Sequence, residues 1–109
     1  MSSGRMTPAV LTLVAERFKA LSEPVRLQIL QALRSGERTV SELVEDTGLG
    51  QANVSKHLRN LLALQFVTRR KDGLFAYYSL ADESVFQLCD VMCNRLEAES
   101  TARRRVLAR

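Results

Sequence analysis

The sequence has 109 residues, of which 46% are hydrophobic and 26% charged, and its formal net charge is +4. This length and composition predict one globular domain with a packed core, and they exclude a disordered or fibrous chain. No apolar run approaches the ~18 residues that a membrane-spanning helix needs, and the first residues lack the apolar stretch of a secretory signal. We therefore expect a single cytoplasmic domain over residues 1–109 without a membrane partner.

The positive charge is concentrated in one segment. Residues 47–71 include no acidic residue and five basic ones: Lys56, Arg59, Arg69, Arg70 and Lys71. The remaining chain has 11 Lys or Arg against 12 Asp or Glu, so the whole positive excess lies in this segment. A localised basic patch indicates a polyanionic partner, although the patch alone is equally consistent with a solvated surface.

Two helices are predicted in the first third of the chain. The first runs from Pro8 to about Leu21, with Pro8 in its first turn. Ser22 is expected to cap the second helix, with Pro24 in its first turn and Gly36 in the left-handed conformation after its end. Each helix has an apolar face: Val10, Leu11, Val14, Phe18 and Leu21 in the first, and Val25, Ile29, Leu30 and Leu33 in the second.

A helix-turn-helix is predicted next. Thr39 and Glu42 have the spacing of a capping box that opens a short third helix, and Gly48 is expected to end it. A tight connection leads into a fourth helix over residues 50–64. This helix has an apolar stripe of Val54, Leu58, Leu61 and Leu62 and a polar stripe of Asn53, Lys56, His57 and Asn60. The polar stripe predicts a DNA-reading helix, and an ordinary helical hairpin in a small bundle is the alternative.

A β-hairpin is predicted after the fourth helix, because the apolar period changes from about 3.6 residues to about two. The strand-like runs are 66–71 and 74–80. Asp72-Gly73 between them is a strong signal for a two-residue type I′ loop, which would pair Lys71 with Leu74 and Val67 with Tyr78. The side chains expected to face the helices are Val67, Ala76, Tyr78 and Leu80. We expect this hairpin to be a wing whose basic residues reach phosphates or a minor groove.

The last helix is predicted to start at Asp82 and Glu83 and to run to about Glu99 or one turn further. Its apolar stripe is too broad for the remaining elements to cover: Val85, Phe86, Leu88, Cys89, Met92, Cys93 and Leu96. We therefore expect a dimer surface here. Residues 1–7 are expected to be loose, and residues 100–109 are expected to form a frayed basic tail, solvated rather than bound to nucleic acid.

The predicted fold is mainly α with a small β-hairpin, in the order of a winged helix-turn-helix, and three segments resemble bacterial repressors of the ArsR/SmtB type. Residues 18–30 resemble their ALSxPxRLxIL opening, and residues 54–61 resemble their vSxHLxxL recognition helix. Lys71-Asp72-Gly73 with Tyr77-Tyr78-Ser79-Leu80 resembles their wing. The resemblance covers roughly Val14 to Met92. It implies a homodimeric repressor, joined through its first and last helices, that an effector releases from a pseudo-palindromic double-stranded DNA operator.

The residues predicted to contact DNA are Gln51, Asn53, Ser55, Lys56, His57, Arg59, Asn60, Arg69, Arg70 and Lys71. Gln and Asn suit adenine, whereas Lys suits guanine or phosphate. Ser55 and Arg59 lie off the main polar stripe, so backbone contacts are expected for them. His57 is the sole histidine. It occupies a position where the family also has histidine, so we expect a DNA-facing residue, or local packing, rather than a metal ligand.

The metal motifs that the resemblance implies are missing. The third helix has Glu42-Leu43-Val44-Glu45-Asp46 in place of a Cys-x-Cys-type motif, and the last helix has no histidine. Cys89 and Cys93, the only cysteines, share one face of that helix at i and i+4. Three interpretations stay open. The two cysteines pack as small apolar residues, or they bind a soft ion such as As, Sb, Cd or Zn, or they sense oxidants or polysulfides.

The predicted function is sequence-specific DNA binding by a transcriptional regulator. A winged-helix protein-interaction module is the alternative from another class, and an effector-independent repressor with packing cysteines is a further one. The basic segment argues against the interaction module. No enzyme is predicted, because the sequence has one histidine and lacks a Gly-rich phosphate loop, clustered carboxylates and a nucleophile elbow.

Overall fold

The computed structural model describes residues 6–107 and confirms the mainly α, winged helix-turn-helix fold. Its elements are α1 (Pro8–Ala20), α2 (Pro24–Ala32), the 3₁₀ helix η1 (Leu33–Ser35), β1 (Arg38–Thr39), α3 (Val40–Thr47), α4 (Gln51–Ala63), β2 (Val67–Asp72), β3 (Phe75–Leu80) and α5 (Val85–Leu107). In this part of the chain, none of the helices has the length and apolar character needed to cross a membrane.

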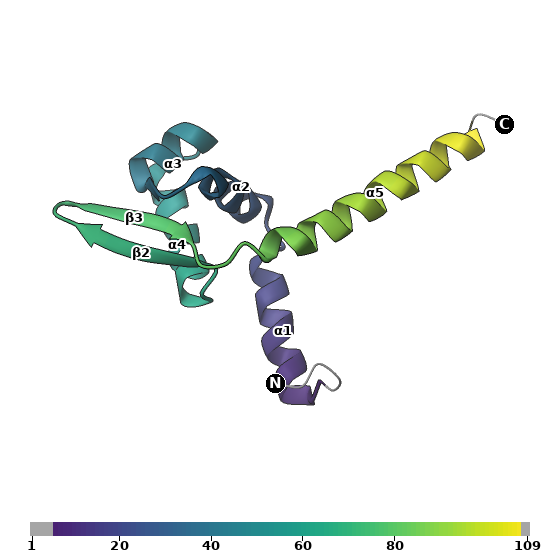
Figure 1. Ribbon diagram of the computed structural model, residues 1–109, viewed down its shortest axis with the longest axis horizontal. Coiled ribbons are helices and arrows are strands. Elements are labelled where there is room, and N and C mark those ends of the chain that lie inside the picture. The colour runs from purple at the N-terminus through teal and green to yellow at the C-terminus, as the bar shows by residue number, and fades with distance from the viewer. Residues whose placement is uncertain (1–5, 108–109) are drawn as a thin grey trace.

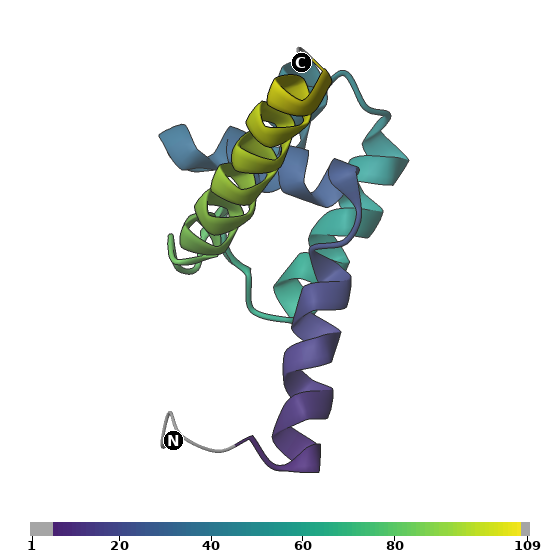
Figure 2. The same ribbon diagram turned by 90° about the vertical axis from the view of Figure 1, so that its right-hand side faces the viewer.

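The molecule has a compact body from which two helices project (Figure 1). α2, α3, α4 and the β2–β3 hairpin form the body, with the hairpin on the side opposite α5. α1 and α5 pack sparsely on the rest and leave the body in different directions (Figure 2). The radius of gyration is therefore 17.2 Å, whereas a compact domain of this length has about 13 Å.

The core lies where α2, α3, α4 and the sheet meet. Its buried side chains are Ile29, Leu30, Leu33, Leu43, Val54, Leu58, Leu61, Val67, Val85 and Phe86. Only the first turn of α5 contributes to this cluster, through Val85 and Phe86. Each fully buried Leu or Ile side chain stabilises the fold by roughly 1.5–3 kcal/mol. The core therefore anchors the body and leaves most of α1 and α5 outside.

The helix ends confirm one predicted signal and correct two. Thr39 and Glu42 form the capping box that begins α3, and Gly48 ends that helix with φ +73°. The prediction that Ser22 caps α2 is wrong, because its hydroxyl instead donates to the Lys19 carbonyl oxygen at the end of α1. Gly36 follows the η1 turn with φ +133° and ψ 177°, so it is not in the predicted left-handed helical conformation.

The sheet has three strands in the order β1–β3–β2, all antiparallel. The predicted hairpin register is wrong: Asp72 pairs with Phe75 and Val67 with Leu80, so the loop is Gly73-Leu74. Gly73 has φ +61°, and Leu74 does not have positive φ. This is the pattern of a type II′ turn, with Gly first, rather than the type I′ turn expected from Asp-Gly.

The correction of register does not change which residues share a face, because it moves the pairing by two residues. Val67 is buried, and Tyr78 and Leu80 pack against the core as predicted. β1 was not predicted from the sequence. It has two residues, too few for an alternating pattern to be visible.

Both ends of the chain differ from expectation where they are described. The predicted loose N-terminus lies partly outside the described residues, but Thr7 caps α1 by accepting a hydrogen bond from the Val10 N–H. The predicted frayed tail is helical: α5 continues through the arginine-rich segment to Leu107. Residues 100–107 are exposed in this chain, and the expectation that the segment is solvated rather than bound to nucleic acid stays a prediction.

The capping box yields a prediction about stability. Hydrogen bonds from the Thr39 backbone N–H and its side chain hold the pKa of Glu42 below its ordinary value. Thr39→Ala is expected to lower the free energy of unfolding by about 1 kcal/mol, measured by urea denaturation, whereas Ser41→Ala on the same helix leaves it unchanged.

The same box gives a pH dependence. Folding lowers the pKa of Glu42. The Glu42 carboxylate therefore contributes fully to the free energy of unfolding when the pH is above its unfolded-state pKa. This contribution is lost as the pH falls through its folded-state pKa. The stability difference between wild type and Glu42→Ala should therefore narrow in acid. A difference that stays constant on acidification would contradict the capping role of the carboxylate.

Candidate nucleic-acid interface

α4 is held by its apolar stripe and exposes the opposite side. Val54, Leu58 and Leu61 are fully buried in the core. α3 packs beside α4, and the connection between them runs through Gly48, Leu49 and Gly50 to the start of α4. The two helices therefore form the predicted helix-turn-helix, in which the position of α4 is fixed by burial of one face.

The exposed row of α4 differs from the predicted polar stripe. Ala52, Lys56, Arg59 and Ala63 are all exposed and recur at i, i+4, i+7 and i+11. Arg59, which was predicted to lie off the main stripe and to contact the backbone, is exposed on the same row as Lys56, and its contact with DNA stays a prediction. Gln51 and Asn53 are also exposed, at the start of the helix, whereas Ser55 and Asn60 are half-buried.

The prediction that His57 faces DNA is wrong. Its side chain is buried, with 5% of the residue exposed, and its Nδ1 accepts a hydrogen bond of 3.1 Å from Arg26 Nε. His57 lies between exposed Lys56 and buried Leu58, at the boundary of the two stripes. The alternative of local packing is the one that the structure supports for this histidine.

The wing presents its basic residues on two faces. Arg69 and Lys71 share a face with buried Val67, because alternate residues of a strand point the same way. Both are exposed, and neither forms an ion pair within the described part of the chain. Within the described residues their charges are therefore not offset by an ion pair and are accessible to a polyanion.

Arg70 points to the other face and is engaged within the protein. Its guanidinium forms ion pairs with Glu37 at 2.7 Å and with Asp72 at 3.4 Å, and it lies 4.6 Å from the centre of the Tyr77 ring. The hydrogen bond to Glu37 is the main reason that the pKa of Arg70 is raised. Arg70 thus ties the wing to the segment before α3, and part of its charge is neutralised there.

The tip of the wing is apolar. Leu74, in the turn, is 99% exposed, and Phe75 beside it is 59% exposed. Asp72 pairs with Phe75 across the hairpin, and Lys71 pairs with Ala76 one position further from the turn. The wing therefore ends in an exposed apolar tip that follows both an acidic and a basic residue.

A second surface is formed by α1 and α5. Their exposed apolar side chains are Leu11, Leu13, Phe18, Leu88, Val91, Met92 and Leu96, each between 48% and 62% exposed. We call this set the α1–α5 face. An exposed apolar surface of this breadth on a small domain marks an interaction site.

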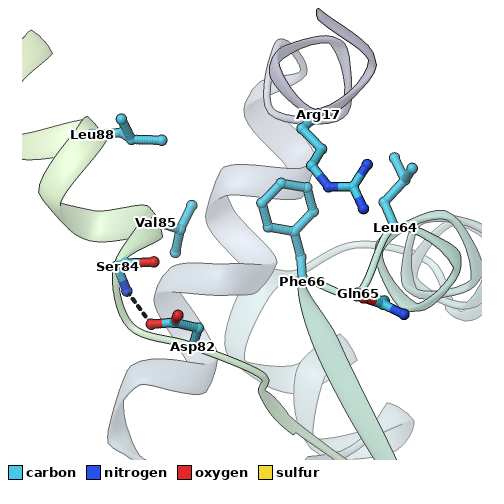
Figure 3. A pocket seen from close by; sticks show the side chains of 8 residues that line it. All are labelled: Arg17, Leu64, Gln65, Phe66, Asp82, Ser84, Val85 and Leu88. Carbon is cyan, nitrogen blue, oxygen red and sulfur yellow. Dashed lines mark hydrogen bonds between the residues drawn. The ribbon is translucent and has the colours of Figure 1, made fainter. Parts of the chain in front are cut away.

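A hollow lies at the base of the α1–α5 face, between α1, the end of α4 and the start of α5 (Figure 3). Arg17 and Phe66 line one side of it, and Val85 and Leu88 line the other. Asp82 accepts a hydrogen bond from the Ser84 backbone N–H at 2.8 Å and so closes the first turn before α5. The hollow is continuous with a more apolar one lined by Phe18, Leu21 and Leu88.

The two cysteines lie on the α1–α5 face. Both are free thiols; Cys89 is half-buried and Cys93 is exposed. Cys89 also lines a small apolar hollow with Phe18, Leu27 and Met92. Within residues 6–107, no group of three or more His, Cys, Asp and Glu side chains is placed to hold a metal ion.

Sequence reasoning missed two residues that organise the site. Glu37 holds the wing through Arg70, and Arg26 contacts His57 on α4. Arg26 lies in the segment that resembles the family opening, but its partner is 31 residues away. Neither pairing has a local sequence signal, because each joins elements that come together only in the fold.

Comparison with known proteins identifies the family. A model described as bacterial regulatory protein, arsR family, matches residues 23–69. Over 88 residues the chain is 42% identical to a probable mercury resistance operon repressor of Streptomyces lividans, with 81% of this chain and 69% of that protein covered. The chain belongs to the arsR family.

Two further relatives support this membership. Over 76 residues the chain is 40% identical to the HTH-type transcriptional regulator KmtR of Mycobacterium tuberculosis; the match covers 70% of this chain but 58% of KmtR. The homodimeric winged helix-turn-helix DNA-binding domain of Mb0332 from Mycobacterium bovis matches with a TM-score of 0.75 and 34% identity, over 89% of this chain and 95% of that one. Membership confirms the family resemblance seen in the sequence.

The contact between Arg70 and Glu37 yields a prediction about the wing. Glu37→Gln should leave the melting temperature nearly unchanged, because exposed ion pairs contribute little to stability. It should increase nanosecond motion of β2 and β3, measured as lower backbone ¹⁵N order parameters. Glu45→Gln, an exposed change on α3, serves as the control. Equal order parameters in wild type and Glu37→Gln would show that Arg70 does not hold the wing.

Proposed function

We propose that this protein is a homodimeric, sequence-specific DNA-binding transcriptional repressor. The observation that carries the proposal is the exposure of the basic side chains Lys56 and Arg59 on α4 and Arg69 and Lys71 on the wing, in a segment without acidic residues. α4 would enter the major groove while the wing contacts the adjacent backbone.

The α1–α5 face supports the dimer. Its apolar side chains are about half exposed or more within the described residues, and most of α1 and α5 projects from the body. A second copy buries the same patch on both partners under two-fold symmetry. The related Mb0332 domain is homodimeric. Two recognition helices would then lie ~34 Å apart and read a pseudo-palindrome.

Roles within the interface follow from exposure. We assign base contacts to Gln51, Asn53 and Lys56, which are exposed on the first turns of α4. Arg59 on the same row is assigned to base or phosphate, and half-buried Ser55 and Asn60 to the edge of the interface. On the wing, Arg69 and Lys71 are assigned to phosphate, and Arg70 contributes mainly by holding the wing in place.

A protein-interaction module is the remaining rival, since winged helices also bind proteins. The absence of acidic residues from 47–71 favours DNA over a protein partner of mixed charge. The relatives matched here are named as regulators and repressors, which supports the same choice.

Affinity for two duplexes tests the proposal. One duplex is selected by wild type from a random-sequence pool, and the other is an unselected random duplex. Arg69→Ala should weaken binding to both and lower the slope of log affinity against log salt by about 1. Asn53→Ala should reduce the preference for the selected duplex by a factor that corresponds to about 1–3 kcal/mol.

Arg104→Ala, which removes an exposed charge far along α5, is the matched control and should change neither quantity. If wild type selects no sequence from the pool, the proposed function is wrong. If Arg69→Ala and Asn53→Ala behave like Arg104→Ala, the interface has been placed on the wrong surface.

We further propose that a soft, thiophilic ion is the effector and that Cys89 and Cys93 bind it. Both thiols are free, share one helix face and are accessible in one chain. Their position on the α1–α5 face would let ion binding favour one dimer geometry over another. The name of the Streptomyces lividans relative, a mercury resistance operon repressor, supports a thiophilic ion. Packing or thiol oxidation are the competing roles.

DNA release tests this site. Hg(II) or As(III) should lower the affinity of wild type for its selected duplex by ~5–150-fold, the range of ordinary allosteric coupling. Cys89→Ser, Cys93→Ser and the double variant should bind DNA as wild type does but ignore the ion. Release by peroxide or polysulfide alone would instead assign redox sensing, and release of the double variant by the ion would remove the cysteines from the mechanism.

A further inference from the structure

Arg26 lies at the point where α1, α2 and α4 meet. Its side chain is 13% exposed, and its Nη2 forms an ion pair of 2.8 Å with Glu23 Oε2 on the residue that precedes α2. Its Nε donates to His57 Nδ1 on α4 at 3.1 Å. A longer hydrogen bond of 3.4 Å reaches the Ala20 carbonyl oxygen at the end of α1. The guanidinium of Arg26, on α2, thus contacts α4, the end of α1 and the residue that precedes its own helix.

The contact with His57 is different in kind from the packing around it. The other buried residues of α4 are Val54, Leu58 and Leu61, whose burial is favourable but non-directional. The hydrogen bond between Arg26 and His57 has a required distance and angle. It is therefore suited to fixing the rotation and tilt of α4 against α2, which apolar contacts leave comparatively free.

His57 is adjacent to the exposed row of α4. Lys56 precedes it directly, and Arg59 follows two positions later. A small rotation of α4 that lengthens the contact with Arg26 would also move these two side chains. Displacements of about 1 Å at a functional group are enough to lose a productive geometry.

We propose that Arg26 is a positioning residue that, through His57, holds α4 in the orientation that reads DNA sequence. The inference rests on the proposed DNA-binding function and deepens it. The Glu23 carboxylate orients the guanidinium, Arg26 donates to His57, and the imidazole carries that constraint into the recognition helix. Neither Arg26 nor His57 contacts DNA.

The arrangement fixes the tautomer of His57. Arginine is always protonated and can only donate, so Nδ1 must be the unprotonated ring nitrogen and the proton must be on Nε2. Long-range ¹H–¹⁵N correlation spectra of the folded protein should show this tautomer. A proton on Nδ1 would overturn the proposal, and this result does not depend on DNA.

Variants then separate positioning from stability. The probes are the duplex that wild type selects from a random pool and an unselected duplex. His57→Leu and Arg26→Gln should lower the ratio of selected to unselected affinity by about tenfold or more, the loss of one or two base contacts. Affinity for the unselected duplex and its salt slope should stay close to wild type, because the wing phosphate contacts remain.

Rescue and a control complete the test. His57→Asn places an amide oxygen near the position of Nδ1, where it can accept the hydrogen bond from Arg26. This variant should therefore have a ratio of selected to unselected affinity close to that of wild type. Leu33→Ala lowers stability from a buried site outside α3 and α4 and should leave the ratio unchanged where the protein is folded. If His57→Leu and Arg26→Gln keep the wild-type ratio, or if Leu33→Ala lowers it equally, Arg26 has no positioning role. If wild type selects no sequence, the proposed function fails instead.

Discussion

Burial of one face of α4 is the constraint on which the rest of the structure depends. Val54, Leu58 and Leu61 are fully buried, and they are spaced at helical period. Once these three positions face the core, the opposite side of the helix faces outward, while its finer rotation is the part that we assign to Arg26 and His57. α2, α3 and Val67 of the wing provide the surface that buries them. The exposed row with Lys56 and Arg59 is the consequence.

The features predicted from the sequence are those that have local causes. The capping box of Thr39 and Glu42, the left-handed Gly48 and the apolar stripes each involve residues within a few positions of one another. The change of period after α4 likewise revealed the wing. Because these local signals occur in the order of a winged helix-turn-helix, the fold could be predicted almost completely.

The features that were missed or wrong depend on contacts between distant segments. His57 lies at the boundary between the apolar and polar stripes of α4, where helical period alone does not decide whether a side chain is buried or exposed. Its hydrogen-bond partner, Arg26, belongs to another helix. Arg70 was predicted from the sequence to contact DNA, but in the fold it forms an ion pair with Glu37, which is distant in the sequence. The hairpin register depended on the sign of one φ angle, because a type I′ loop over Asp72-Gly73 needs positive φ at both residues and Asp72 does not have it.

In the proposed mechanism, the α1–α5 face would connect effector binding with DNA reading. It carries Cys89 and Cys93, and α1 reaches the core of the reading module through the Ala20 carbonyl oxygen beside Arg26. A change in dimer geometry would thus act at the base of α4 as well as on the spacing between its two copies. Beyond its first turn, where Val85 and Phe86 enter the core, α5 is largely exposed, which is consistent with this role.

A chemical footprint of the protein on its selected duplex tests the central claim most directly. Methylation protection at guanine N7 reports the major groove, and hydroxyl-radical cleavage reports the backbone. The account predicts two symmetric major-groove segments with centres about 10–10.5 base pairs apart, flanked by backbone protection from the wings. One protected segment, or backbone protection without any in the major groove, would contradict a dimer that reads DNA through α4.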